Sequence, residues 1–405
     1  MSCKNERAHF CMQDGGNMTL IELYDERPLE NVLGVEVFCP SRVVYVCPER
    51  VSSDPGHVRK LEAYFAHRKL DIPIHFFYTS VYDAAKVVEL LRKIVTQYQE
   101  CAIDITGGTD AVLFAAGMLC SEKEIPVFTY SRRKNAFYNI KDAAFADALP
   151  CTVTYTVEDC FRMAGGAMRT GRVENEKLKA YHSFIEPFFA VYLKYRTQWT
   201  NIVTYIQKIS MTKNDEPASM TAMGEFAVKG ERGSKIIAPE EALKALERIR
   251  LIQGLRFEAK RTVSFQFYDA QVRMWLRDVG SVLELYVYKA CLDTGLFDDV
   301  RLSAVVDWEG QGEKDAVTNE LDVMCTRGVV PYFFSCKTCE IHTEALNELA
   351  ILRDRFGGEI AKAAIVTAET ANAAMRNRAA ELDIIVIDLD DLTSERIKER
   401  IIQMV

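Results

Sequence analysis

The chain has 405 residues, of which 49% are hydrophobic and 27% are charged. This length is enough for two or three domains with a core each, and the composition is that of a folded protein, which excludes disordered and fibrous classes. The net charge of -8 argues against a protein that coats nucleic acid nonspecifically.

Charge is unevenly distributed along the chain. Residues 1–150 hold 17 Lys and Arg against 20 Asp and Glu, residues 151–270 hold 18 against 14, and residues 271–405 hold 15 against 24. A basic middle part therefore separates a near-neutral first part from an acidic last part. We expect these three parts of the chain to bind different ligands.

Targeting signals and disulfide patterns are absent from the sequence. No stretch approaches the roughly 20 apolar residues of a membrane-spanning helix, and Met1–Leu20 carries charges and glycines in place of an apolar signal core. The 12 cysteines are scattered without a framework spacing, which favours reduced thiols. We expect a cytoplasmic protein with no membrane partner.

Residues 18–150 show short β-branched and aromatic runs that alternate with segments of helical period. The expected strands are Thr19–Tyr24, Val43–Cys47, Ile74–Tyr78, Ala102–Thr106 and Val127–Tyr130. The clearest expected helices between them are His57–Lys69, Val81–Gln99 and Thr109–Glu122. This alternation predicts an α/β, Rossmann-like domain with a mostly parallel sheet, whose ligand binds at the carboxyl ends of the strands.

Residues 151–270 are less regular and read as a small helical connector. The expected helices are Val157–Met168, Glu174–Ile209 and Pro239–Ile252, and alternation over Arg256–Phe267 indicates a hairpin. A helix followed by a hairpin is typical of a winged-helix-like unit.

Residues 271–405 form the third part, with an expected α-β-β-β-α-β core. The expected order is a helix at Val279–Thr294, strands at Val300–Asp307, Glu320–Cys325 and Val330–Cys336, a helix at Thr343–Phe356, a strand at Lys362–Val366, a helix at Ala371–Leu382, a strand at Ile384–Ile387 and a terminal helix.

The first candidate site is the glycine-containing turn Asp104–Thr109, between an expected strand and an expected helix. Gly107 and Gly108 let the backbone approach a ligand closely, Thr109 can cap the helix, and the N-terminus of a helix attracts phosphate. The alternative is a tight turn with no ligand. The glycine spacing is neither that of a dinucleotide fingerprint nor that of a P-loop, so NAD and ATP are not favoured.

Two charged loops are expected on the same rim as this turn. Tyr24–Pro28, with Asp25 and Arg27, follows the first strand, and Ser131–Lys134, with Ser131 and Arg132, follows the fifth. The basic run could hold phosphates, although charge clusters on loops are more often solvated surface.

The second candidate site combines Glu284 with carboxylates and a lysine on two adjacent strands. Side chains two apart in a strand share a face, so Glu320 points with Asp322, and Ser335 points with Lys337, while Leu321 and Cys336 face the core. Convergent oxygen ligands suit a hard divalent ion, and a lysine can stabilise the charge of phosphodiester cleavage. The alternative is acidic residues on the wet side of an amphipathic sheet.

A zinc site is a third possibility. Cys336 and Cys339 form a Cys-x-x-Cys pair with His342 nearby, and Cys325 is a conceivable fourth ligand. Because no second cysteine pair occurs, core thiols are the better interpretation.

Together, the two sites resemble a family of CRISPR-associated nucleases. In that family an N-terminal CARF domain (a CRISPR-associated Rossmann fold) precedes a PD-(D/E)xK restriction-endonuclease-like domain. The turn Asp104–Thr109 is similar to the CARF ligand motif, and residues 280–284 (GSVLE), 319–323 (NELDV) and 335–338 (SCKT) are similar to successive nuclease motifs. The resemblance extends from about Met18 to the C-terminus.

The resemblance implies an activator site and a metal site. The activator, a cyclic oligoadenylate and in particular cyclic tetra-adenylate, would bind across a homodimer. The residues matched to its site are Asp25, Arg27, Thr106, Gly107, Gly108, Thr109, Ser131 and Arg132.

The implied reaction is metal-dependent cleavage of single-stranded DNA or RNA, with double-stranded DNA as a further substrate, in type III CRISPR defence. Glu284, Asp322, Ser335 and Lys337 would be the catalytic residues. Manganese or magnesium would be held by Asp322, Glu284, Glu320 and a backbone carbonyl near Cys336.

Two positions depart from the family's pattern. Asp110 stands where the glycine motif usually continues with lysine, and Ser335 stands where a carboxylate is expected two residues before Lys337. Ser335 leaves open an alternative, a non-catalytic sensor or transcription regulator with a decayed nuclease fold. A HEPN ribonuclease is excluded, because the sequence has no Arg and His spaced four to six residues apart in one helix.

Overall fold

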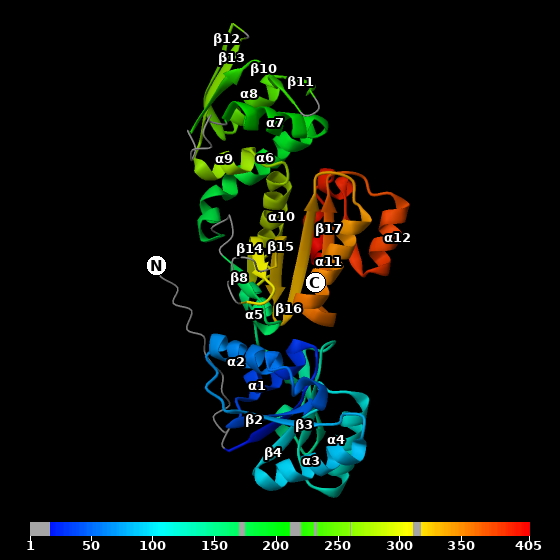
Figure 1. Cartoon of the computed structure of the whole chain (residues 1–405). Coiled ribbons are helices and arrows are strands. Elements are labelled where there is room, and N and C mark those ends of the chain that lie inside the picture. Colours follow the sequence, from blue (N-terminus) through cyan, green and yellow to red (C-terminus); the bar gives the residue numbers. More distant parts are fainter. Residues whose placement is uncertain (1–16, 170–174, 211–219, 231–232, 260, 311–316) are drawn as a thin grey trace.

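The described residues fold into three layered parts, which together contain four β-sheets (Figure 1). The computed structural model describes residues 17–169, 175–210, 220–230, 233–259, 261–310 and 317–405. The N-terminal part lies at one end, residues 271–405 form the middle, and most of the segment between them in sequence lies at the opposite end (Figure 1).

The N-terminal domain is a seven-stranded sheet with the order β3-β2-β1-β4-β5-β6-β7. Its strands are β1 (Thr19–Leu23), β2 (Arg42–Pro48), β3 (Ile74–Thr79), β4 (Cys101–Asp104), β5 (Val127–Ser131), β6 (Ala136–Lys141) and β7 (Leu149–Pro150). Its α-helices are α1 (Leu33–Phe38), α2 (Gly56–Arg68), α3 (Ala84–Gln97) and α4 (Asp110–Glu122). Strands β1 to β5 are parallel, and β6 and β7 are antiparallel.

Helices cover both faces of this sheet, as expected for a doubly wound fold. One face packs on α3 and α4 through side chains such as Ile21, Val44 and Ile103, and the opposite face packs through Leu20, Val43 and Ala102. Adjacent residues of each strand thus enter opposite cores, which explains why these strands are mostly apolar. The carboxyl ends of β1, β4 and β5 meet at one rim, where the candidate ligand loops lie.

Most of the middle segment lies at the far end of the C-terminal domain and not between the two large domains (Figure 1). Helix α5 (Val157–Met163) is shorter than the helix expected over Val157–Met168, and β8 (Ala167–Arg169) pairs with β14 (Asp299–Asp307) in the C-terminal sheet. The expected helix is therefore wrong beyond Met163, because Gly165 and Gly166 end it and the chain then becomes a strand.

The rest of this segment forms a helical layer with a small sheet. Its elements are a 3-10 turn η4 (Asn175–Tyr181), α6 (His182–Tyr195), a 3-10 turn η5 (Arg196–Gln198), α7 (Trp199–Ser210), β9 (Thr221–Glu225), β10 (Ala227–Lys229), β11 (Lys235–Ile237), α8 (Glu240–Arg248), β12 (Ile252–Glu258), β13 (Thr262–Phe267) and α9 (Ala270–Leu276). The expected helix and hairpin are confirmed as α8, β12 and β13, and β9 adds a third strand to the hairpin.

The C-terminal domain is a six-stranded sheet with the order β18-β17-β16-β15-β14-β8. Its further elements are α10 (Ser281–Thr294), β15 (Thr318–Arg327), β16 (Val330–Lys337), α11 (Thr343–Gly357), a 3-10 turn η7 (Gly358–Ile360), β17 (Lys362–Thr367), α12 (Ala373–Glu381), β18 (Ile384–Ile387), α13 (Leu389–Thr393) and α14 (Ile397–Met404). The expected α-β-β-β-α-β core is confirmed, and with it the α/β fold class.

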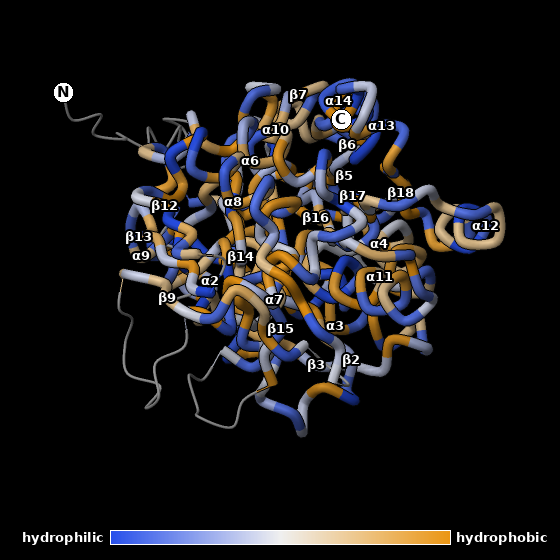
Figure 2. The backbone as a smooth tube through the Cα atoms, turned by 90° about the horizontal axis from the view of Figure 1, so that it is seen from above, coloured by the Kyte–Doolittle hydropathy of each residue, from blue (hydrophilic) through white to orange (hydrophobic). Residues whose placement is uncertain are grey.

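The C-terminal sheet is buried on both faces. Helix α10 and the helices of the middle segment share one core with residues such as Val323 and Phe334, while α11 packs on the other face against Phe333 and Ile365. Helix α12 projects at the edge of the molecule (Figure 2), in keeping with Ala379 as its buried residue. Within the described ranges, no helix has the length and apolarity required to cross a bilayer.

Candidate functional site

Asp322 lies where the ladder between β15 and β16 ends. The last paired residues are Val323 and Phe334, so the next residues on the two strands are Asp322 and Ser335. On the other side of β15, the pairs on β14 pass from Leu302 to Ala304, and the intervening Ser303 has a φ of 52°. The strands thus separate around Asp322, which leaves room for its side chain.

Backbone and side-chain donors hold the Asp322 carboxylate in place. Its Oδ2 accepts a hydrogen bond of 2.6 Å from the Cys336 N–H, and the Ser335 Oγ lies 3.4 Å from the same oxygen. Burial raises the pKa of Asp322, and the Cys336 hydrogen bond opposes that rise. Leu321 and Cys336 are buried, as the period-two pattern predicts.

Glu284 approaches the same position from the first turn of α10. That helix begins at Ser281, whose N–H and Oγ both donate to Asp278 at 2.8 Å. Burial, followed by the negative charge of Asp322, raises the pKa of Glu284 to about 8. These residues line a cavity of about 160 Å³, together with Glu320.

Lys337 ends β16 next to these carboxylates. Burial raises the pKa of both Asp322 and Glu284, and the positive charge of Lys337 opposes this rise. Lys337 is therefore within electrostatic reach of both carboxylates. Lys337 is half-buried, whereas Glu320 is exposed. The structure thus brings Glu284, Asp322, Ser335 and Lys337 together at one end of β16, with Glu320 at the rim.

The donor set fits a divalent cation in its chemistry. Two partly buried carboxylates, of which Asp322 raises the pKa of Glu284, are stabilised by a nearby positive charge, and oxygen donors are those that Mg²⁺ and Mn²⁺ prefer. Within the described ranges, no group of three or more His, Cys, Asp and Glu side chains is arranged to hold a metal. A backbone carbonyl and water would therefore have to complete the coordination.

The zinc interpretation has little support in the geometry. Cys336 is buried in the core beneath Phe334, whereas Cys339 is exposed. His342 is the N-cap residue of α11.

The glycine turn joins β4 to α4 as expected. Gly108 has a φ of 95°, in the left-handed region that favours glycine, and a Cβ there would lie 2.9 Å from the Leu23 Cβ. A Cβ on Gly107 would lie 2.9 Å from the Leu23 carbonyl oxygen. Both glycines are therefore required by the packing of the turn on β1, whether or not a ligand binds.

Two donors of the turn are used within the protein. The Gly108 N–H donates to Asp25 Oδ2 at 3.1 Å, and the Thr106 N–H donates to Asp104 Oδ1 at 2.7 Å. The Thr106 Oγ1 also accepts from the Tyr130 N–H at 2.8 Å, which ties β4 to β5. Thr109 is the N-cap residue of α4, but its side chain makes no capping hydrogen bond, so that expectation is wrong.

Arg27 and Arg132 reach the same rim from the loops after β1 and β5. Arg27 donates to Asp25 Oδ2 at 2.8 Å, and this hydrogen bond offsets burial and lowers the pKa of Asp25. Ser131 is half-buried at the end of β5. The sequence-predicted ligand residues are thus gathered at one rim.

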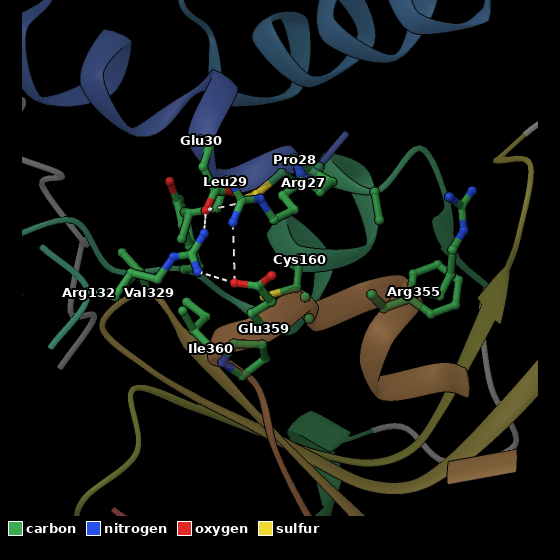
Figure 3. Close-up of a pocket in the computed structure, with 17 residues that line it drawn as sticks. Arg27, Pro28, Leu29, Glu30, Arg132, Cys160, Val329, Arg355, Glu359 and Ile360 are labelled. Atoms are coloured by element: carbon green, nitrogen blue, oxygen red, sulfur yellow. Dashed lines mark hydrogen bonds and ion pairs between the residues drawn. The ribbon is translucent and has the colours of Figure 1, made fainter. Parts of the chain in front are cut away.

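Sequence reasoning missed three acidic residues of this region. Glu30 is buried against Arg132, and Glu359 of the C-terminal domain contacts Arg27 and Arg132 (Figure 3). Glu22 lies beside Asp104 on the neighbouring strand. A charged residue within the apolar run of β1 was a usable signal for Glu22, but the pairing of Glu359 depends on the tertiary fold.

Comparisons with known proteins agree with this architecture. Residues 271–404 match the family model described as "Card1-like, endonuclease domain". The C-terminal part of the chain is therefore similar to endonuclease domains of the Card1-like type. No curated protein matches the chain at a significant level.

Two solved structures share the fold over nearly the whole chain. Protein VC1899 from Vibrio cholerae has a TM-score of 0.71 at 15% identity, covering 95% of this chain and 97% of that chain. Can2 from Sulfobacillus thermosulfidooxidans, solved in complex with cyclic tetra-adenylate (cA4), has a TM-score of 0.69 at 16% identity, covering 96% and 99% respectively.

Proposed function

We propose that the chain is a metal-dependent nuclease activated by cyclic tetra-adenylate in type III CRISPR defence, because residues 271–404 match the Card1-like endonuclease family model. The observation that carries the proposal is the cluster of Asp322, Glu284 and Lys337, formed where β15 and β16 separate. The substrates we propose are single-stranded DNA or RNA, with double-stranded DNA as a further one.

The proposed roles follow from the chemistry of each side chain. Asp322 and Glu284 would hold Mn²⁺ or Mg²⁺, with Glu320 and a carbonyl near Cys336 as further donors. Such an ion lowers the pKa of water and neutralises phosphate charge when bound. The Cys336 N–H fixes the orientation of Asp322, and Lys337 would stabilise negative charge on the scissile phosphate.

The N-terminal rim supports the activator part of the proposal. Gly107 and Gly108 precede the N-terminus of α4, and two arginines lie nearby. The resemblance to Can2, solved with cyclic tetra-adenylate, favours this ligand over other anions.

An exposed apolar face supports a homodimer. Phe114 and Met118 on α4 are 64% and 41% exposed, and α4 begins directly after the glycine turn. A two-fold axis beside α4 would bring two such turns together around one ring.

Asp322→Asn tests the nuclease assignment. It removes the charge of the carboxylate but keeps an oxygen that can accept from the Cys336 N–H, so the fold should be retained. We expect cleavage of labelled single-stranded DNA and RNA, with cyclic tetra-adenylate and manganese, to fall at least about 100-fold, while calorimetry shows unchanged activator binding. Lys337→Ala should act similarly.

A matched control is Asp293→Asn. Asp293 is on the same helix as Glu284 and pairs with Lys289 and Lys398 outside the cavity. The Asp293→Asn variant should cleave DNA and RNA at the wild-type rate. Equal activity of Asp322→Asn would contradict the assignment, and a wild type that binds the activator but cuts nothing at any manganese concentration would favour the sensor alternative.

A further inference from the structure

Glu359 of the nuclease domain occupies both arginines of the proposed activator rim. Its Oε2 accepts from Arg27 Nη1 at 3.3 Å and from Arg132 Nη1 at 2.5 Å. Figure 3 shows the Glu359 carboxylate directed between the two guanidinium groups, one from each of two N-terminal loops. The hydrogen bond from Arg132 lowers the pKa of Glu359, so the carboxylate is charged at neutral pH.

Carboxylates of the protein thus stand where phosphates of the activator are expected. Asp25 accepts a hydrogen bond from the Gly108 N–H and forms an ion pair with Arg27, and Glu30 forms an ion pair with Arg132. Arg27, Glu30, Arg132 and Glu359 line a cavity of about 30 Å³, whereas ligand sites commonly measure about 300 Å³ or more. A nucleotide phosphate therefore cannot reach the two arginines from this cavity unless Glu359 moves away.

Glu359 is connected to the nuclease site by two strands. It lies in η7, directly before β17, and the cavity also includes Pro331 at the start of β16. These strands pair in parallel from Tyr332 and Lys362 to Lys337 and Thr367. Both strands therefore begin near the arginines, and they end at the paired residues Lys337 and Thr367.

We propose that Glu359 is an inhibitory latch that competes with the activator for Arg27 and Arg132. Phosphates of the ring displace the carboxylate, and the release of η7 lets β16 and β17 shift at the end that carries Ser335 and Lys337. The latch deepens the proposed function, on which it rests, by assigning the regulation of the same site.

The exposure of the latch suits displacement. The Glu359 side chain is 63% exposed, and those of Arg27 and Arg132 are 36% and 28% exposed. Exposed ion pairs are weak and screened by salt, so a ligand with several phosphates can replace this carboxylate.

Glu359→Gln tests the latch, with binding measured by calorimetry and cleavage measured without activator. The variant keeps the size of the side chain and should fold, because the residue is exposed. We expect cyclic tetra-adenylate to bind about three- to tenfold more tightly, the range that corresponds to one or two exposed ion pairs. Without cyclic tetra-adenylate, we also expect cleavage above the wild-type background. For Glu359→Lys we expect larger increases in both the affinity for the ring and the cleavage without it.

Glu381→Gln is the matched control. It removes an equal charge from the same domain and breaks an exposed ion pair with Arg378, so both its affinity and its background cleavage should equal those of the wild type. Wild-type affinity in Glu359→Gln would overturn the latch alone. A wild type that binds no cyclic tetra-adenylate would contradict the proposed function itself, and the latch with it.

Discussion

At the scale of single residues, Ser335 occupies a position at which a carboxylate would add a ligand for a metal ion. Its Oγ lies 3.4 Å from Asp322 Oδ2, so a longer acidic side chain at this position would reach the region of the two carboxylates. We expect Ser335→Glu to lower the manganese concentration that gives half-maximal cleavage, because a further carboxylate adds charge and a ligand atom. Activity with magnesium should rise as well, since magnesium needs a more complete shell.

Ser335→Ala is the matched control for this substitution. It removes a neutral oxygen at the edge of hydrogen-bonding distance and should change the manganese dependence little. If Ser335→Glu left the metal dependence unchanged, the placement of this side chain at the metal would be wrong.

A buried carboxyl pair lies beneath the glycine turn. Glu22 and Asp104 are each 1% exposed and occupy paired positions on β1 and β4. Glu22 Oε1 and Asp104 Oδ2 have no hydrogen-bond partner among the described residues. Burial raises the pKa of Asp104 to about 7 and that of Glu22 well above its usual range.

This pair makes the stability of the N-terminal domain depend on pH. An acid whose pKa is higher in the folded state binds more protons there than in the unfolded state, so stability falls as pH rises from about 4 to about 7. The slope can reach about 1.4 kcal/mol per pH unit for one group. Hydrogen exchange of β1 and β4 amides should show this loss, and Asp104→Asn should reduce the slope.

Asp110→Asn provides the control for the pH dependence. This carboxylate is exposed at the start of α4, so its replacement should leave the slope as in the wild type. Equal slopes in Asp104→Asn and the wild type would show that the buried pair does not titrate as described.

The residues that could be predicted from the sequence are those governed by local patterns. Period-two alternation placed Leu321 and Cys336 in the core, and both are buried in the structure. In contrast, Glu359 is 332 positions from Arg27, and no local pattern relates the two. The carboxylates that occupy the activator rim therefore became visible only in the tertiary structure.

At the scale of elements, helix α1 packs closely over the carboxyl pair. A Cβ on Gly34 would clash with Asp104 Oδ2 and lie 3.0 Å from Glu22 Oε1. We expect Gly34→Ala to destabilise the domain by about 1–3 kcal/mol, because the buried carboxyl groups have little room to move. Chemical denaturation would measure the change.

Gly117→Ala is the opposite case on α4. A Cβ there meets nothing within 4 Å, and alanine is preferred over glycine inside a helix by up to about 1 kcal/mol. This variant should be as stable as the wild type or more so. If Gly34→Ala were equally harmless, α1 would not be held as closely over the pair as the structure indicates.

Element prediction succeeded where the hydrophobic period is long and failed where elements are short. The strands β1 to β5 and the core of the nuclease domain follow clear runs of apolar residues. Strand β8 has three residues, too few to show a period, and its position depends on pairing with β14. Strands β6 and β7 and helix α1 were likewise missed; β7 and α1 are short, and in β6 the exposed Asn139 and Ile140 depart from a regular alternation.

At the scale of the whole molecule, α4 presents more apolar surface than a monomer requires. Its sequence, DAVLFAAGMLCSE, is apolar almost all round, a pattern typical of a helix that is buried on every side. Yet Phe114 is 64% exposed. A second copy of the chain would cover this face and place two glycine turns around one ring.

Phe114→Glu, alone or with Met118→Glu, should therefore dissociate the proposed dimer. In a two-fold contact the same residue of both chains lies at the interface. Each substitution therefore introduces two negative charges into the contact, one from each chain. Sedimentation equilibrium should show a wild-type dimer and a dissociation constant raised at least about tenfold in the variant. Binding of cyclic tetra-adenylate should weaken in parallel, because each chain then offers only half of the phosphate contacts.

Ile140→Glu is the control for Phe114→Glu. It tests whether the dimer dissociates because the apolar face of α4 is changed or because any exposed apolar residue is replaced by glutamate. Ile140 is 55% exposed on β6 of the same domain, so its replacement adds the same charge without touching α4. It should remain dimeric and bind the ring as the wild type does. A monomeric wild type that binds the ring with full affinity would mean that one chain supplies the entire site, and the apolar face of α4 would then need a different partner.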